Sequence, residues 1–176
     1  KLKFEVEYLK GKIWNGKGYN INGNIEFKIK DGKGNIKEYN NIGKLEFEGE
    51  YRNGERNGKG KELDDNGQII FEGEYRNGEK DGKGKEYNDG ILRFEGKYLN
   101  GKRWNGNGYN IYGSIEFEIK DGNGKGKEYN YRGDLVFEGE YRNGKRNGKG
   151  KEYDYNGELV FEGEYKNGIR NGKGKE

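Results

Sequence analysis

The sequence predicts an all-β fold in which tandem β-hairpins join into one elongated, twisted, open, single-layer antiparallel sheet. Phenylalanine recurs eight times at gaps of 20 to 24 residues, and such a period indicates a repeat architecture. The 35 glycines exclude long helices, because a glycine inside a helix costs about 1 kcal/mol. Short runs of period-two alternation, separated by Asn-Gly or Asp-Gly pairs, are typical of hairpins with tight turns.

The composition replaces an aliphatic core with aromatic rings. Only 28% of residues are hydrophobic and 38% are charged, which does not suit a conventional globule. The 35 basic residues nearly cancel the 32 acidic ones, so the chain lacks the high net charge of disordered segments. Each of the 15 Tyr, 8 Phe and 2 Trp residues can bury about 150–250 Å². We therefore expect an ordered chain held together by stacked rings.

Eight repeat units follow one another along the whole chain. They begin at Phe4, Phe27, Phe47, Phe71, Phe94, Phe117, Phe137 and Phe161. The pattern of gaps repeats after four units, and residues 1–86 match residues 91–176 at 59 of 86 positions without a gap. We therefore expect a single repeat array over 1–176, built from a first four-unit block (1–90) and a second one (91–176) that arose by duplication.

Residues 47–62 show the predicted hairpin most clearly. Phe and Tyr alternate with Glu in the first run, an Asn-Gly pair follows, and the second run alternates Gly with Lys. Pairing the two runs places Glu48 and Glu50 on the same face as Lys59 and Lys61, and the rings on the face of the glycines. One face of the sheet should therefore be an aromatic stack and the other a charge ladder. A lone hairpin is marginal in water, so the units must stack on their neighbours.

Two hairpins are four residues shorter than the one at residues 47–62. The hairpins that begin at Phe27 and Phe117 close at Asp31-Gly32 and Asp121-Gly122, and Asp-Gly is a typical pair for a type I′ turn. We expect short, tightly closed hairpins at both places.

Aromatic residues supply the candidate interaction sites. Trp14 and Trp104 each add a ring to a predicted loop, where tryptophan can anchor an interface. Packing on the neighbouring hairpin is the alternative interpretation. The repeated tyrosines of the aromatic face are the other candidates, namely Tyr51, Tyr75, Tyr141 and Tyr165.

Lysines in the second run of the hairpins are candidate contacts for anionic lipid. They are Lys59, Lys61, Lys83, Lys85, Lys149 and Lys151. Each lysine near a membrane surface can contribute about 1 kcal/mol. The alternative is that each one pairs with a glutamate across the strand, which would oppose lipid binding.

The residue inventory argues against catalysis. The chain has no His, Cys or Thr, and Ser114 is its only serine, which removes most nucleophile–base pairs and His- or Cys-based metal sites. The Gly-Lys strings lack the Ser or Thr of a phosphate-binding loop. Residues 64–67 resemble the start of a calcium loop but lack its later ligand, so we expect a turn. We expect no enzyme, cofactor, metal or small-molecule substrate, and a net charge of +3 does not predict a nucleic-acid partner.

The string Phe-Glu-Gly-Glu-Tyr-x-Asn-Gly-x-x-Asn-Gly-Lys-Gly at residues 137–150 resembles the MORN repeat (membrane occupation and recognition nexus), with Asn147 where His is often found. The segments between hairpins, such as residues 151–160, are also similar to MORN-like repeats of bacterial antitoxin proteins. The short hairpins depart from the pattern. The resemblance implies a half-pipe of hairpins that acts as a scaffold, a dimerisation module or a membrane-skeleton tether, in some proteins fused to a catalytic domain.

The sequence therefore favours a non-enzymatic scaffold for protein–protein interaction or for end-to-end assembly into a filament, dimer or spacer. Residues 1–176 stop four residues short of two full blocks, so the chain is either a window onto a longer array or a two-block protein. Unless the array continues, the strands at the two ends of the open sheet are unpaired edges, and such edges attract further strands, including those of a second copy. One alternative is a peripheral module that binds anionic lipid or phosphoinositide. Another is the regulatory arm of a longer protein, or an antitoxin. A cytoplasmic or membrane-skeleton location is favoured, while the first residue, Lys1, is compatible with a trimmed N-terminus and an extracellular location.

Overall fold

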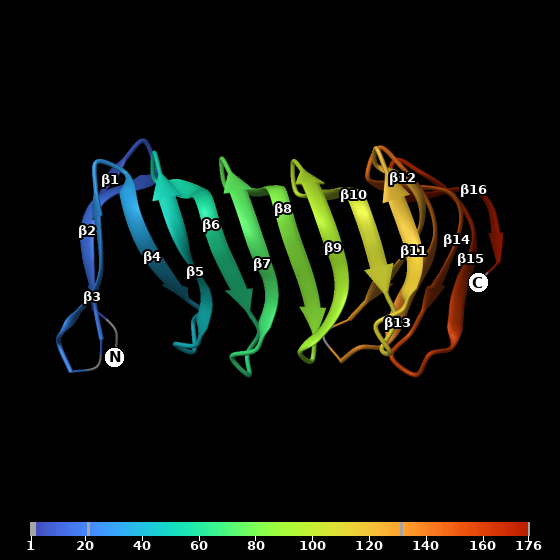
Figure 1. Cartoon of the computed structure of the whole chain (residues 1–176), viewed down its shortest axis with the longest axis horizontal. Helices are drawn as coiled ribbons and strands as arrows, with labels where there is room; N and C mark the ends of the chain where they lie inside the picture. Colours follow the sequence, from blue (N-terminus) through green and yellow to red (C-terminus); the bar gives the residue numbers. More distant parts are fainter. Residues whose placement is uncertain (1–2, 21, 131, 176) are drawn as a thin grey trace. The chain divides into compact units, whose positions relative to one another are not determined.

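The computed structural model describes residues 3–20, 22–130 and 132–175, which form sixteen antiparallel strands in one open sheet. Each strand pairs with its neighbours in sequence, in the order β1 to β16, so the sheet contains no crossover (Figure 1). Among these residues there is no helix, and hence none long and apolar enough to span a membrane. The predicted all-β fold of tandem hairpins is confirmed.

The strands divide into two compact units, which we describe separately. The N-terminal unit is Lys1–Gly82 and the C-terminal unit is Lys83–Glu176, so the division falls within β8. The N-terminal unit holds β1 (Lys3–Leu9), β2 (Lys12–Tyr19), β3 (Ile25–Lys30), β4 (Lys33–Tyr39), β5 (Leu45–Arg52), β6 (Glu55–Leu63), β7 (Ile69–Arg76) and the start of β8 (Glu79–Asn88). The C-terminal unit holds the rest of β8, β9 (Ile91–Leu99), β10 (Lys102–Tyr109), β11 (Ile115–Lys120), β12 (Asn123–Tyr129), β13 (Leu135–Arg142), β14 (Lys145–Tyr153), β15 (Leu159–Lys166) and β16 (Ile169–Lys175).

Two-residue turns close the hairpins. In the β5–β6 hairpin, Asn53 and Gly54 have φ angles of 55° and 72°. A type I′ turn requires positive φ at both positions, which Asn, Asp and Gly tolerate best. Asp31-Gly32 and Asp121-Gly122 also have positive φ at both residues, so the predicted tight closure of the short hairpins is confirmed.

Five-residue loops connect most hairpins to the next. In the loop after β6, the Asp64 carboxylate accepts hydrogen bonds from the backbone N–H groups of Asn66 (2.9 Å) and Gln68 (2.8 Å). An aspartate that caps its own loop in this way forms an Asx turn. The predicted turn at residues 64–67 is therefore confirmed.

A bulge in the regular hairpins was not predicted. In the β5–β6 pair, Gly49 lies opposite Gly60 and Tyr51 lies opposite Arg56, so three residues of β6 face one residue of β5. Gly58 lies inside this bulge with a φ of 110°, which favours glycine. Because the bulge adds two residues, the alternation of faces is kept beyond it, and Arg56 stays on the aromatic face.

Aromatic rings form the core in both units. In the N-terminal unit, Phe47 and Tyr75 meet edge to face, with ring centroids 5.3 Å apart and an interplanar angle of 85°. Phe137 and Tyr165 of the C-terminal unit repeat this contact at 5.3 Å and 81°. Glycines lie beneath the rings, since a Cβ atom at Gly60 would lie 2.6 Å from Phe47 Cζ. The predicted aromatic stack with a glycine floor is confirmed.

The first half of the N-terminal unit has a more aliphatic core. Phe27, Ile29 and Ile36 are buried together, and Ile13 and Tyr51 pack against them. These isoleucines stand where regular hairpins have glycine or a cation. The short hairpin therefore has isoleucines at two glycine positions, and Ile13 of β2 replaces the cation of a regular hairpin.

Candidate interaction surfaces

A cation lies on the aromatic face of each regular hairpin, nine residues after its phenylalanine. The Arg146 guanidinium carbon lies 4.0 Å from the centroid of the Phe137 ring. The same contact recurs for Arg56 on Phe47 (4.0 Å), Lys80 on Phe71 (4.0 Å), Arg103 on Phe94 (4.8 Å) and Arg170 on Phe161 (4.2 Å). A cation over a ring face is attracted by the ring's electron density, by about 0.5–2 kcal/mol.

A glutamate two strands earlier in the sheet holds each of these cations, and a second glutamate on the arginine's own strand also holds Arg56 and Arg146. Arg146 donates to Glu128 through Nε (3.0 Å) and Nη2 (2.6 Å), and to Glu152 through Nη1 (2.7 Å). The Tyr141 hydroxyl also donates to Glu128. Burial alone would raise the pKa of Glu128, but Arg146 and then Tyr141 outweigh it and hold that pKa below its ordinary value. The aromatic face is thus a repeated chain of Tyr–Glu–Arg–Phe contacts.

This network places the four candidate tyrosines inside the stack. Tyr75 and Tyr165 are only 4% exposed, and Tyr51 and Tyr141 are half-buried. The Tyr75 hydroxyl donates to Glu62 at 2.9 Å. These internal tyrosines therefore take part in the stack.

On the opposite face, lysines and glutamates alternate from strand to strand. Lys61 lies opposite both Glu48 and Glu72, and Lys59 lies opposite Glu74. On β14, Lys149 lies opposite Glu164, and Lys151 lies opposite both Glu138 and Glu162. On β8, the Lys85 Nζ atom is 3.4 Å from Glu95, and the Lys83 side chain is exposed. The register therefore gives the charge ladder that the sequence predicts.

A second row of tyrosines lies on the charged face and was missed from the sequence. The Tyr129 hydroxyl donates to Glu116 (2.8 Å), and the Tyr153 hydroxyl donates to Glu138 (2.7 Å). Burial, followed by the hydrogen bond to glutamate, raises the pKa of each of these tyrosines to about 12. The recurring Glu-Tyr pair that precedes several connecting loops is the signal that could have revealed them.

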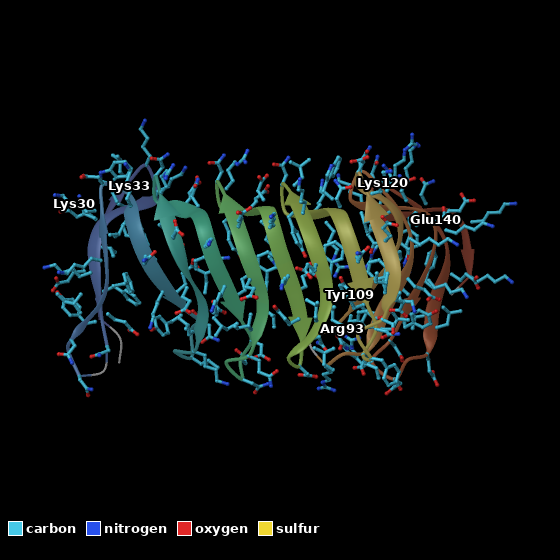
Figure 2. All side chains as sticks on the ribbon, in the orientation of Figure 1. Lys30, Lys33, Arg93, Tyr109, Lys120 and Glu140 are labelled. Atoms are coloured by element: carbon cyan, nitrogen blue, oxygen red, sulfur yellow. The ribbon has the colours of Figure 1, made fainter. Side chains whose placement is uncertain are left out.

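The charged face of the C-terminal unit is hollowed into a groove of about 700 Å³. Glycines line its floor, and rows of Lys125 and Lys149 alternate with Glu140 and Glu164. Figure 2 shows charged side chains extending from the strands, with Lys120 and Glu140 labelled in this unit. Opposite charges in adjacent rows leave the groove nearly neutral, which suits a polar protein surface better than an anionic polymer.

Contacts between distant residues shape the C-terminal unit. The Asn88 side chain donates to the Asn130 carbonyl at 2.8 Å, and the buried Arg93 guanidinium carbon lies 4.5 Å from the Tyr129 ring centroid. Arg93, labelled in Figure 2, lies on β9, three strands from β12. These contacts join the β8–β9 connection to the loop after β12.

The prediction that the tryptophans lie in loops is wrong, because Trp14 lies on β2 and Trp104 on β10. Each tryptophan lies against the turn of the following short hairpin. The Trp104 carbonyl accepts a hydrogen bond from the Gly122 N–H (2.7 Å), and a Cβ atom at Gly122 would lie 2.8 Å from the Trp104 ring. Trp14 and Gly32 repeat the arrangement at 2.8 Å and 2.9 Å. Both indole rings are half-buried. This geometry favours packing on the neighbouring hairpin over an exposed anchor.

The β1 end of the sheet exposes rings that internal hairpins bury. Phe4 and Tyr8 of β1 are 48% and 64% exposed, whereas Phe94 and Tyr98 at the equivalent positions of β9 are 0% and 4% exposed. Among the described residues, β1 pairs only with β2, and β16 pairs only with β15. Both end strands therefore present an open edge.

The MORN repeat family matches this chain at residues 47–69, 71–91, 137–158 and 161–176. The chain carries MORN repeats. The short hairpins and the tryptophans lie outside these four segments, in agreement with the departures seen in the sequence. A search of curated proteins found no similar sequence.

MORN repeats are generally non-enzymatic modules that bind proteins or membranes. Within residues 3–20, 22–130 and 132–175, no group of three or more acidic, His or Cys side chains is arranged to hold a metal ion.

Proposed function

We propose that this MORN repeat chain is a non-enzymatic scaffold whose copies join end to end through β1 and β16. The observation that carries the proposal is the exposure of Phe4 and Tyr8, because the equivalent rings of internal hairpins are covered by the neighbouring hairpin. An open strand edge with exposed rings is a template for another strand. A second copy offers the same kind of strand that covers these positions inside the chain.

The expected affinity is modest. Covering the exposed parts of two rings removes roughly 200–300 Å² of apolar surface, which contributes about 5–7 kcal/mol at about 25 cal/mol per Å². Association itself costs about 4–15 kcal/mol, and the backbone hydrogen bonds of the new strand pair offset part of this cost. Assembly should therefore depend strongly on protein concentration.

The residue chemistry supports a non-enzymatic role. The sequence has no His, Cys or Thr, so the usual nucleophile–base pairs are missing. The carboxylates with lowered pKa, such as Glu38 and Glu128, hydrogen-bond to arginine and tyrosine of the stack. Such contacts account for these shifts as part of a structural network.

Light scattering over a hundredfold range of concentration tests the proposal. The average mass of the 176-residue chain should rise through multiples of the 20.3 kDa monomer as concentration increases. A mass that stays at the monomer value over the whole range would rule out self-assembly as the function.

A peripheral membrane module is the second candidate, favoured by the tips of the connecting loops. Ile42 is 71% exposed, and in the C-terminal unit Ile111, Tyr112 and Tyr155 are 54%, 85% and 73% exposed. Aliphatic and tyrosine side chains at exposed tips suit the interfacial region of a bilayer, while the lysines are balanced by opposing glutamates.

Flotation with vesicles of anionic lipid tests this candidate. Binding should weaken in Ile111→Ser/Tyr112→Ser, whereas Asn66→Ser, at another loop tip, should bind as the wild type does. Absence of flotation at low salt would exclude the membrane role.

A further inference from the structure

We propose that the seam between copies repeats the register of the internal strand pairs, with β16 of one copy antiparallel to β1 of the next. The inference rests on the proposed end-to-end function and adds the pairing of individual residues. It follows from a strand pair that the chain already builds four times, at β4–β5, β6–β7, β12–β13 and β14–β15.

The β14–β15 pair is the template. Lys149 lies opposite Glu164 and Lys151 lies opposite Glu162, so two opposite charges meet on the charged face. On the aromatic face, the ring of Tyr165 packs edge to face on Phe137 of the preceding hairpin, with centroids 5.3 Å apart. Each new hairpin thus adds two charge pairs and one ring contact to the one before it.

The end strands carry the two halves of this template. β16 contains Arg-Asn-Gly-Lys-Gly-Lys at residues 170–175, the string found at 146–151 in β14. β1 contains Phe-Glu-Val-Glu-Tyr at residues 4–8, which matches Phe-Glu-Gly-Glu-Tyr at 161–165 in β15 except for the central residue. β16 therefore corresponds to β14, and β1 corresponds to β15.

Carrying the register over assigns the contacts at the seam. Lys173 of one copy lies opposite Glu7 of the next, and Lys175 lies opposite Glu5. Tyr8 packs on Phe161, as Tyr165 packs on Phe137 within the chain. The seam therefore covers the most exposed ring of β1.

The single difference between residues 4–8 and residues 161–165 also fits the seam. Val6 stands where β15 has a glycine, and inside the chain it lies opposite Gly16. In the proposed register Val6 lies opposite Gly174 of the other copy. The valine would thus have a glycine, without a side chain of its own, across the strand on both sides, and its methyl groups would lie beside the Phe161 ring that covers Gly174.

The charges select the polarity of assembly. Pairing β1 with β1 would set Glu5 and Glu7 against glutamates, and pairing β16 with β16 would set Lys173 and Lys175 against lysines. Like charges directly opposite one another on paired strands are destabilising. Only the β16–β1 pair satisfies both charge rows, so the contact is head to tail and can extend beyond two copies.

Charge reversal tests this register in two variants of the full chain. One variant is Glu5→Lys/Glu7→Lys, and the other is Lys173→Glu/Lys175→Glu. Each alone should need an about tenfold or higher concentration for half-maximal assembly than the wild type, because both charge pairs become repulsive. An equimolar mixture should assemble near the wild-type concentration, since each seam then joins opposite charges. The control Glu46→Lys/Glu79→Lys makes the same charge change as Glu5→Lys/Glu7→Lys, at exposed positions away from both edges.

If circular dichroism shows that a charge-reversed variant does not fold, disulfide trapping gives an independent test of the register. The chain has no cysteine, so Glu7→Cys/Lys173→Cys places one thiol on each side of the seam. Mild oxidation should link copies into covalent ladders, while Glu7→Cys/Lys175→Cys, two residues out of register, should link at least fivefold less.

The outcomes separate the register from the function. Self-assembly of the wild type with no effect of the reversals, or equal linkage in both cysteine variants, would overturn the register but leave end-to-end assembly standing. A wild type that stays monomeric at every concentration would overturn the proposed function itself.

Discussion

Replacing Arg146 with methionine removes the guanidinium that lies on the Phe137 ring and joins Glu128 to Glu152. The contact with the ring contributes about 1–2 kcal/mol. Removing one partner of a fully buried ion pair costs about 3–5 kcal/mol, because the remaining charge has no counterion. The Arg146 side chain is 24% exposed, so water recovers part of this loss. We expect Arg146→Met to lower the free energy of unfolding by about 2–4 kcal/mol.

Urea unfolding followed by circular dichroism and by fluorescence measures this change, with Trp14→Phe in every variant so that Trp104 alone reports on the C-terminal unit. Arg142→Met is the matched control, since Arg142 is exposed on the same hairpin and should change stability by less than about 0.5 kcal/mol. Arg146→Lys should cost about 1 kcal/mol, because Lys80 already fills this role on Phe71 and reaches Glu62 at 2.9 Å. Equal stability of Arg146→Met and Arg142→Met would refute the structural role of the network.

Three further predictions concern pH and the turns. Glu128 has a pKa below its ordinary value in the folded chain, so on acidification this carboxylate is protonated first in the unfolded chain. The melting temperature should therefore be constant above about pH 4.5 and fall as the pH drops through the folded-state pKa. Tyr129 and Tyr153 have folded pKa values of about 12, against about 10 when unfolded, so stability should fall from pH 10 to 12, and tyrosinate absorbance at pH 11 should be lower in the folded chain. Gly122→Ala should lower the free energy of unfolding by at least about 2 kcal/mol more than Gly113→Ala does, because both glycines have positive φ but only a Cβ atom at Gly122 would meet other atoms. Equal losses of stability in urea unfolding would contradict the packing of Trp104 on this turn.

The hairpins, their turns and the two faces of the sheet could be predicted from the sequence. Alternation with period two assigns Phe47 and Glu48 to opposite faces, and Asn-Gly or Asp-Gly pairs locate the turns without tertiary information. These features depend on residues close in sequence, which is why the local pattern is sufficient.

The cations of the aromatic face were missed although the pattern contained them. The alternation that places Gly60 beneath the rings also places Arg56 and Glu62 on that face. Treating every charge as part of the solvated face concealed this. A partly buried arginine needs both a ring and carboxylates around it, and one of the carboxylates around Arg56, that of Glu38, comes from two strands earlier in the sheet.

Contacts between residues distant in sequence could not be predicted. The link between Asn88 and Asn130 spans 42 residues and depends on how the strands of the C-terminal unit curve. The packing of Trp104 on Gly122 requires the position of the next turn in space. The sequence showed that each tryptophan adds a ring to its hairpin and that the following hairpin is four residues shorter, but not that the ring and the short hairpin lie in contact.

Amide hydrogen exchange of the wild-type chain at low and high protein concentration tests end-to-end assembly most directly. Assembly through the end strands predicts that protection rises with concentration in residues 4–9 and 169–175, while internal strands such as β5 and β13 stay unchanged. Protection that does not change in β1 and β16, or that rises only in another part of the sheet, would contradict assembly through these edges.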